Sequence, residues 1–171
     1  MKFNPGDVLL YTSPHLKFKY LLAHGIRLVE GSQIIHVAIY LDNNFIIEAL
    51  DGKVQIKYLP ELINRTNGMV LYGTATLSNT SIVYQDIYAI ASLFNNKPYG
   101  YLTDINILFQ HGKCLLFPKK PWTVWFKSRN GYMCSETALL IYQALGNKFP
   151  KLACLTEPND LLKAPWTVTK I

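Results

Sequence analysis

Residues 34–50 read IIHVAIYLDNNFIIEAL, and this stretch decides the fold that we expect for the chain. Ile34–Leu41 is rich in branched and aromatic residues, which favour a strand. Asp42-Asn43-Asn44 has the composition of a turn, and Phe45–Leu50 repeats the strand pattern. Two such strands joined by a short polar turn predict a β-hairpin.

The geometry of this hairpin decides whether His36 and Glu48 can meet. With Asp42-Asn43-Asn44 as a three-residue loop, His36 faces Leu50, and His36 and Glu48 become diagonal neighbours on one face, roughly 7 Å apart at the backbone. A two-residue loop is expected to put them on opposite faces. A carboxylate bonded to one ring nitrogen leaves the other for a thiol. The alternative interpretation is a polar outer face on which both side chains are solvated.

Cys134 lies near the expected start of a helix over residues 131–146, which read GYMCSETALLIYQALG. Apolar residues recur there at helical spacing, and Gly146 suits a C-terminal cap. A helix N-terminus presents unpaired N–H groups and the positive end of the helix dipole, and both stabilise a thiolate or an oxyanion. The alternative is a buried cysteine that packs as a small hydrophobe, which is the commoner role of a single cysteine.

The rest of the chain predicts further strands and helices in one domain over residues 1–171. Apolar or alternating runs predict strands at 8–11, 53–57 and 68–76, and helical patterns occur at 15–29, 60–63, 81–94 and 157–162. Residues 98–131 are rich in Pro, Gly and aromatic residues and are expected to wrap the surface. The sum is an α+β fold in which helices pack against an antiparallel sheet.

The composition is that of a globular protein, with 50% hydrophobic and 16% charged residues and a net charge of +6. Met1–Asp7 leads into no apolar signal region, and no run is long enough to span a membrane. The three cysteines form no CxxC pair, so we expect free thiols in the cytoplasm or another reducing compartment. No nucleic-acid motif is present, so the charge indicates either attraction to anionic surfaces or plain solubility.

The remaining chemically interesting residues are weaker candidates. No strand acid lies near His15, His24 or His111, and apolar segments hold Cys114 and Cys154. Glu136 is expected to serve the helix dipole or a structural contact. Tyrosines suit a pocket with aromatic walls, and the candidate substrate-binding residues are Tyr11, Tyr40, Tyr99 and Tyr132.

Six short motifs follow one another along nearly the whole chain. They are Gly6-Asp7 before a strand, His36-Val37-Ala38-Ile39-Tyr40, Glu48-Ala49, Pro98-Tyr99-Gly100-Tyr101, Cys134-Ser135-Glu136 and Pro158-Asn159-Asp160-Leu161. In this order they resemble the circularly permuted branch of the NlpC/P60 superfamily, and its YiiX-like members in particular. Each motif is short, and their conjunction carries the resemblance.

The resemblance implies a circularly permuted papain-like fold, with an antiparallel sheet or small barrel packed against helices. It implies Cys134 as nucleophile, His36 as base and Glu48 as the acid that orients His36. The sequence shows no cofactor or metal motif, and this chemistry requires neither. The implied reaction cleaves an amide, peptide or isopeptide bond, for example in cell-wall peptides, through an acyl-enzyme. One alternative is a lipid acyltransferase or thioesterase that uses the same three residues, and another is a non-catalytic binding module. Trp122–Phe126 matches no motif and is a candidate wall of the substrate cleft.

Overall fold

The computed structural model describes residues 3–11, 34, 36–66, 70–75, 84–103, 105–106, 109, 131–147, 160–161 and 166–170. Within these residues the strands are β1 (Val8–Tyr11), β2 (His36–Asp42), β3 (Phe45–Leu50), β4 (Lys53–Tyr58), β5 (Val70–Ala75) and β6 (Trp166–Lys170). The labelled helices are α2 (Leu59–Thr66), α3 (Tyr84–Phe94) and α5 (Cys134–Ala144).

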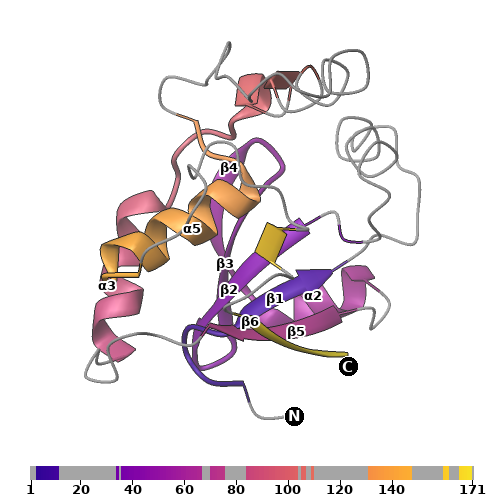
Figure 1. Cartoon of the computed structure of the whole chain (residues 1–171), viewed down its shortest axis with the longest axis vertical. Coiled ribbons are helices and arrows are strands. Elements are labelled where there is room, and N and C mark those ends of the chain that lie inside the picture. The colour runs from indigo at the N-terminus through magenta and orange to yellow at the C-terminus, as the bar shows by residue number, and fades with distance from the viewer. Residues whose placement is uncertain are drawn as a thin grey trace, which may run out of the picture.

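The strands form one sheet in the order β4-β3-β2-β1-β5-β6, and every neighbouring pair is antiparallel. Figure 1 shows α3 and α5 together on one side of this sheet and α2 on the other. The expected α+β fold, with helices against an antiparallel sheet, is therefore confirmed. No helix in the described ranges combines the length and the hydropathy that crossing a bilayer requires.

Both faces of β2 are buried, which explains its unbroken apolar sequence. Side chains alternate along a strand, so Val37 and Ile39 pack on the side of α3 and α5. Ala38 and Tyr40 pack on the opposite side, in a second cluster that includes Leu59 of α2. The solvated outer face considered from the sequence is therefore absent at this hairpin.

The turn between β2 and β3 has two residues, so the predicted three-residue loop is wrong. Asp42 pairs with Phe45, which leaves Asn43 and Asn44 as the turn. Their φ angles are 49° and 62°. Positive φ at both central residues is the requirement of a type I′ turn, and asparagine tolerates it better than most residues.

A β-bulge in β2 offsets the shorter turn. The register shifts between Tyr40 and Asp42, so Leu41 is an extra residue without its own partner on β3. Beyond it Ala38 pairs with Glu48, which is the register that a three-residue loop would have produced. The expectation that a two-residue turn separates the two faces was wrong, because the bulge supplies the missing residue.

The other elements agree with the sequence to within a few residues, except at the C-terminal end. The strands expected at 8–11, 53–57 and 68–76 and the helices at 60–63, 81–94 and 131–146 correspond to β1, β4, β5, α2, α3 and α5. Strand β6 was not predicted. Residues 15–29 and 122–126 lie outside the described residues, as do parts of 98–131 and 157–162.

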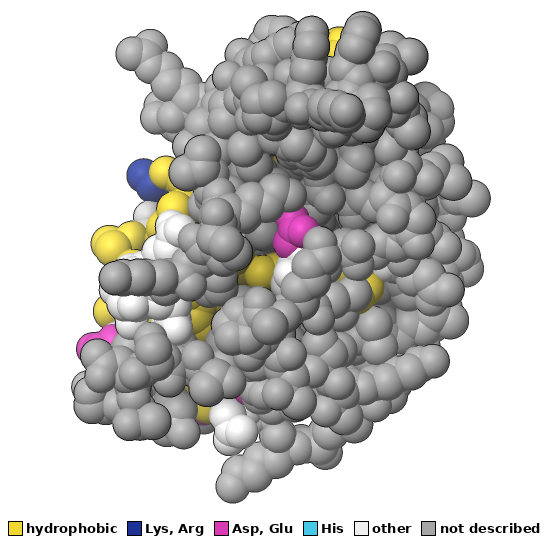
Figure 2. All heavy atoms as spheres, viewed as in Figure 1, with side chains coloured by type: hydrophobic (Ala, Val, Ile, Leu, Met, Phe, Trp, Pro, Cys, Tyr) yellow, Lys and Arg dark blue, Asp and Glu magenta, His cyan; other side chains and the backbone are white. Residues whose placement is uncertain are grey.

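The surface of α3 is partly apolar. Tyr88 and Leu93 are both largely exposed. In Figure 2 hydrophobic side chains reach the surface along the edge where Figure 1 draws α3, and a basic side chain lies beside them. No histidine colour is visible among the described side chains on this face, which agrees with the burial of His36.

Candidate active site

The ends of three elements meet at one point of the fold. Strand β1 ends at Tyr11, β2 begins at His36, and α5 begins at Cys134. Tyr11 and His36 are direct partners in the β1–β2 register. The Cys134 side chain lies close enough to His36 to raise the pKa of its ring. The structure thus brings together the thiol and the imidazole that the sequence proposed as partners.

Glu48 completes the group from β3. Its Oε2 atom lies 3.4 Å from Nε2 of His36, and the two side chains are 0% and 7% exposed. The predicted proximity of these residues on one sheet face is confirmed. At 3.4 Å the contact is a buried ion-pair contact and not a short hydrogen bond.

Tyr11 and Lys57 also contact the Glu48 carboxylate. The Tyr11 hydroxyl donates to Oε2 at 2.5 Å, so it shares this oxygen with His36. Lys57 Nζ lies 3.8 Å from Oε1, and its side chain is 25% exposed. A buried carboxylate needs such partners, because removing it from water without them costs several kcal/mol.

The surroundings of His36 favour its protonated form. Burial alone lowers the pKa of the ring, but its interactions with Cys134, followed by those with Glu48, outweigh burial and raise the pKa from 6.5 to about 9. The ring therefore carries its proton at neutral pH.

The start of α5 has no side-chain cap. Met133 is the N-cap residue and makes no side-chain capping hydrogen bond. Its carbonyl accepts both the N–H and the hydroxyl of Thr137, each at 2.9 Å, which fixes the first turn. A helix begun by an apolar residue keeps N–H groups at its positive end, where an anion is stabilised.

A short segment, residues 98–100, holds the chain that leads into α5. The N–H of Tyr132 donates to the Pro98 carbonyl at 2.9 Å, and the N–H of Gly100 donates to the Tyr132 carbonyl at 3.2 Å. A Cβ atom on Gly100 would lie 3.1 Å from the backbone nitrogen of Met133. A larger residue at this position would force the two closely spaced backbones to shift by a few tenths of an ångström.

The four candidate substrate-binding tyrosines occupy different places. Tyr11 contacts the site directly, and its ring meets that of His36 edge-on at a centroid distance of 4.9 Å. Tyr99 and Tyr132 form an isolated parallel bridge just before Cys134. Tyr40 lies toward the hairpin turn, where its hydroxyl accepts the N–H of Asn44. Contact of these residues with a substrate stays a prediction.

Lys57 was missed in the sequence, although a signal for it exists. Asp51 and Gly52 form a two-residue turn with φ angles of 53° and 92°, which puts Glu48 opposite Gln55. Lys57 then follows Gln55 by two positions on the same face, diagonal to Glu48. A basic residue two positions from the partner of a buried acid is the pattern that would have identified it.

Of the weaker candidates, the structure describes only Glu136. Glu136 is fully buried in the first turn of α5. Cys114, Cys154 and the other three histidines lie outside the described residues. Within the described ranges no three His, Cys, Asp or Glu side chains are grouped so that they could hold a metal ion.

The comparison with solved structures found a similar fold. The chain is similar to the metalloprotein yiiX from Escherichia coli O157:H7 (DUF1105), with a TM-score of 0.59 and 20% sequence identity over 84% of this chain and 67% of that chain. No protein-family model matches the chain, and no curated protein matches it. The expected relation to YiiX-like proteins is therefore confirmed at the level of the fold: the chain has a YiiX-like α+β fold.

Proposed function

We propose that the chain is a cysteine hydrolase with a circularly permuted NlpC/P60 fold, which cleaves an amide or peptide bond through an acyl-enzyme on Cys134. The observation that carries this proposal is the buried contact chain from Cys134 through His36 to Glu48 at the start of a helix. The order His, acid, Cys along the chain fits the permuted papain-like arrangement. A nucleophile, a base and an orienting acid are the three parts that such chemistry needs.

In the first half of the reaction the Cys134 thiolate attacks the substrate carbonyl carbon, and the carbonyl π electrons move onto oxygen. The first-turn N–H groups of α5, a helix without a side-chain cap, are the donors that we assign to this oxyanion. As the intermediate collapses, the C–N bond breaks and the protonated His36 ring gives its proton to the leaving nitrogen. The products are a free amine and a thioester on Cys134.

In the second half water hydrolyses the thioester. The ring of His36, now neutral, takes a proton from water as the water oxygen attacks the acyl carbon. The C–S bond breaks, the carboxylic acid leaves, and the thiolate beside a protonated ring is restored. Throughout the cycle Glu48 orients the ring and balances its charge.

The test is to trap the acyl group. The wild-type protein and the Cys134→Ala variant are incubated with peptidoglycan fragments and, separately, with anionic phospholipid vesicles, and the Cys134 peptide is examined by mass spectrometry. A peptide-derived acyl mass on wild type, with free amine released, supports the hydrolase. A fatty-acyl mass would replace it with the lipid acyltransferase or thioesterase. No adduct, together with iodoacetamide labelling of Cys134 no faster than that of a free thiol, would refute both enzymes.

A further inference from the structure

The Tyr11 hydroxyl makes a short hydrogen bond to the Glu48 carboxylate. Its distance to Oε2 is 2.5 Å, whereas His36 Nε2 lies 3.4 Å from the same atom. Tyr11 is 4% exposed, so water has little access to its side chain. A charge-assisted hydrogen bond of this length is among the stronger contacts in a protein, and it fixes the carboxylate more firmly than the longer contact with the ring does.

We propose that Tyr11 is a positioning residue, which holds the Glu48 carboxylate against His36 through its hydroxyl group. This inference rests on the proposed function, in which Glu48 orients the base. It reassigns Tyr11 from the substrate-binding role expected from the sequence to the support of the acid.

The alternative partner of Glu48 explains why such support is needed. The charged groups that face the carboxylate in the described structure are His36 from β2 and Lys57 from β4. Lys57 lies 3.8 Å from Oε1 and is partly exposed, so it can follow the carboxylate if this turns. Loss of the Tyr11 hydroxyl would therefore favour a turn of the carboxylate toward Lys57 and away from the ring.

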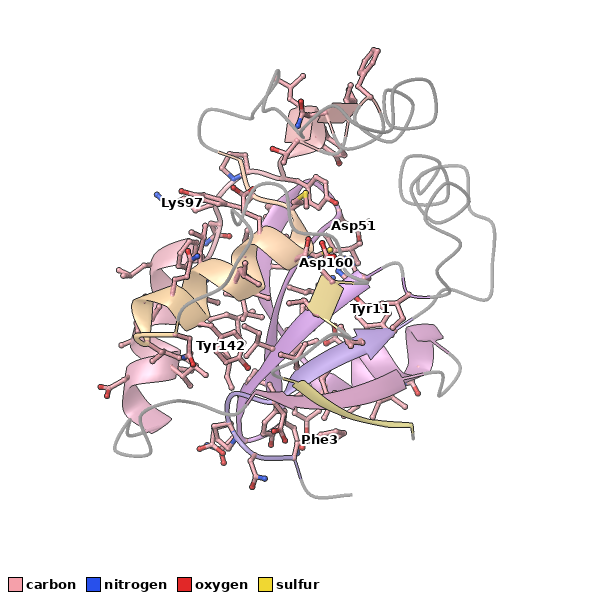
Figure 3. The ribbon with its side chains drawn as sticks, viewed as in Figure 1. Phe3, Tyr11, Asp51, Lys97, Tyr142 and Asp160 are labelled. Atoms are coloured by element: carbon pink, nitrogen blue, oxygen red, sulfur yellow. The ribbon has the colours of Figure 1, made fainter. Side chains whose placement is uncertain are left out.

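The location of Tyr11 suits this role. Figure 3 shows Tyr11 at the end of β1, near the start of α5, whereas Tyr142 lies further along the same helix. Because Tyr11 is paired with His36 across β1 and β2, its backbone and the backbone of the base are fixed relative to each other. The edge-on contact of the two rings limits the freedom of the imidazole as well.

The test is a double-mutant cycle that reads the pKa of His36 by NMR of its ring protons. Tyr11→Phe keeps the aromatic ring and removes only the hydroxyl. We expect it to lower the pKa of His36 in the wild-type background, because Glu48 supports the protonated ring less well. In the Glu48→Gln background the same substitution should have no further effect, because its route of action is already gone.

The result that would overturn the inference is equally specific. An unchanged pKa of His36 in Tyr11→Phe would mean that the hydroxyl does not hold the acid. An equal shift in both backgrounds would mean that Tyr11 acts on the ring directly. This readout needs no substrate, so it decides the inference even if the acyl-trapping experiment fails.

Kinetics supply a second readout. If turnover is found, Tyr11→Phe should lower kcat about 10-fold or more with KM changed less than about twofold, as expected for a lost hydrogen bond to a charged group. A rise in KM at constant kcat would instead place Tyr11 in substrate binding and overturn the inference. Tyr142→Phe is the matched control, because it removes a buried hydroxyl that donates to the Gly6 carbonyl. It should lower stability and leave both the His36 pKa and kcat unchanged.

Discussion

Nε2 of His36 and Oε2 of Glu48 lie 3.4 Å apart because β2 carries one extra residue, Leu41. With a two-residue turn and no bulge, every side chain of β2 that precedes Leu41 would lie on the opposite face relative to its neighbours on β3. The bulge thus places an imidazole and a carboxylate together in a region from which water is nearly excluded. Burying two ionisable groups costs free energy, and their mutual attraction offsets part of this cost. The charge state of each group therefore depends on the other.

The first prediction concerns the charge of Glu48. Glu48→Gln keeps the size of the side chain but removes the negative charge beside the ring. If the chain is the proposed hydrolase, kcat should fall about 10²- to 10⁴-fold, because the ring loses the group that sets its orientation and charge. The measurement is kcat of the purified variant together with its thermal melting curve.

Glu61→Gln is a suitable control for this substitution. Glu61 is an exposed acid in the first turn of α2, so its change to glutamine alters net charge by the same amount. The control should keep wild-type kcat. Equal kcat in Glu48→Gln and wild type would show that another group orients His36.

The second prediction concerns the effect of Cys134 on the pKa of His36. Burial opposes the charged ring, and Cys134 is the largest of the influences that raise the pKa to about 9. Cys134→Ala removes that influence, and burial, which lowers the pKa, is then opposed only by Glu48. The pKa of His36 should therefore fall clearly below 9. NMR titration of the ring protons measures it. A pKa that stays near 9 would mean that the sulfur and the ring do not interact.

The third prediction follows from the same shift as a dependence of stability on pH. The pKa of His36 is higher in the folded state than its unfolded value of 6.5, so the folded state binds the proton more tightly. This contribution is complete below pH 6.5 and is lost as pH rises through about 9. Its slope is at most about 1.4 kcal/mol per pH unit. Urea unfolding of wild type and His36→Gln should show a steeper loss for wild type between these values.

Parallel curves for the two proteins would contradict the raised pKa of His36. If wild type and His36→Gln lost stability in parallel over this range, the proton of His36 would not be linked to folding. The comparison with the variant is essential, because other groups of the chain also titrate in this range. Only the difference between the two curves belongs to His36.

Local sequence patterns were enough to locate most of the fold and the three residues of the site. The apolar runs of β2 and β3 and the cysteine at the start of α5 are local features that a strand or helix period reveals. The register of β2 against β3, however, was predicted correctly from a turn of the wrong length. The bulge at Leu41 depends on how both faces of β2 pack, and no property of residues 41–44 alone shows it.

The features that the sequence did not reveal depend on contacts between distant segments. Tyr11 reaches Glu48 only because β1 pairs with β2, and the pairing of these strands is not encoded in either strand by itself. Strand β6 pairs with β5 although they lie far apart in the chain. Its sequence, Trp166-Thr167-Val168-Thr169-Lys170, does alternate between large and polar residues, and this was the available signal.

The fourth prediction tests the support of Cys134 by residues 98–100. A Cβ atom on Gly100 would lie 3.1 Å from three backbone atoms, which belong to Gly131, Tyr132 and Met133. Backbone atoms cannot rotate away as a flexible side chain can, so Gly100→Ala must push the two segments apart. It should cost about 1–3 kcal/mol of stability and slow the alkylation of Cys134 by iodoacetamide, because the start of α5 moves relative to His36.

Gly146→Ala separates this effect from a general loss of stability. Gly146 follows the other end of α5 with a φ of 87°, and a Cβ atom there would meet nothing within 4 Å. Its replacement costs about 1 kcal/mol through backbone strain alone. The alkylation rate of Cys134 should then equal that of wild type, whereas Gly100→Ala should reduce it at a similar loss of stability. Equal alkylation rates in all three proteins would show that the contact between residues 98–100 and 131–133 stabilises the fold but does not position the thiol.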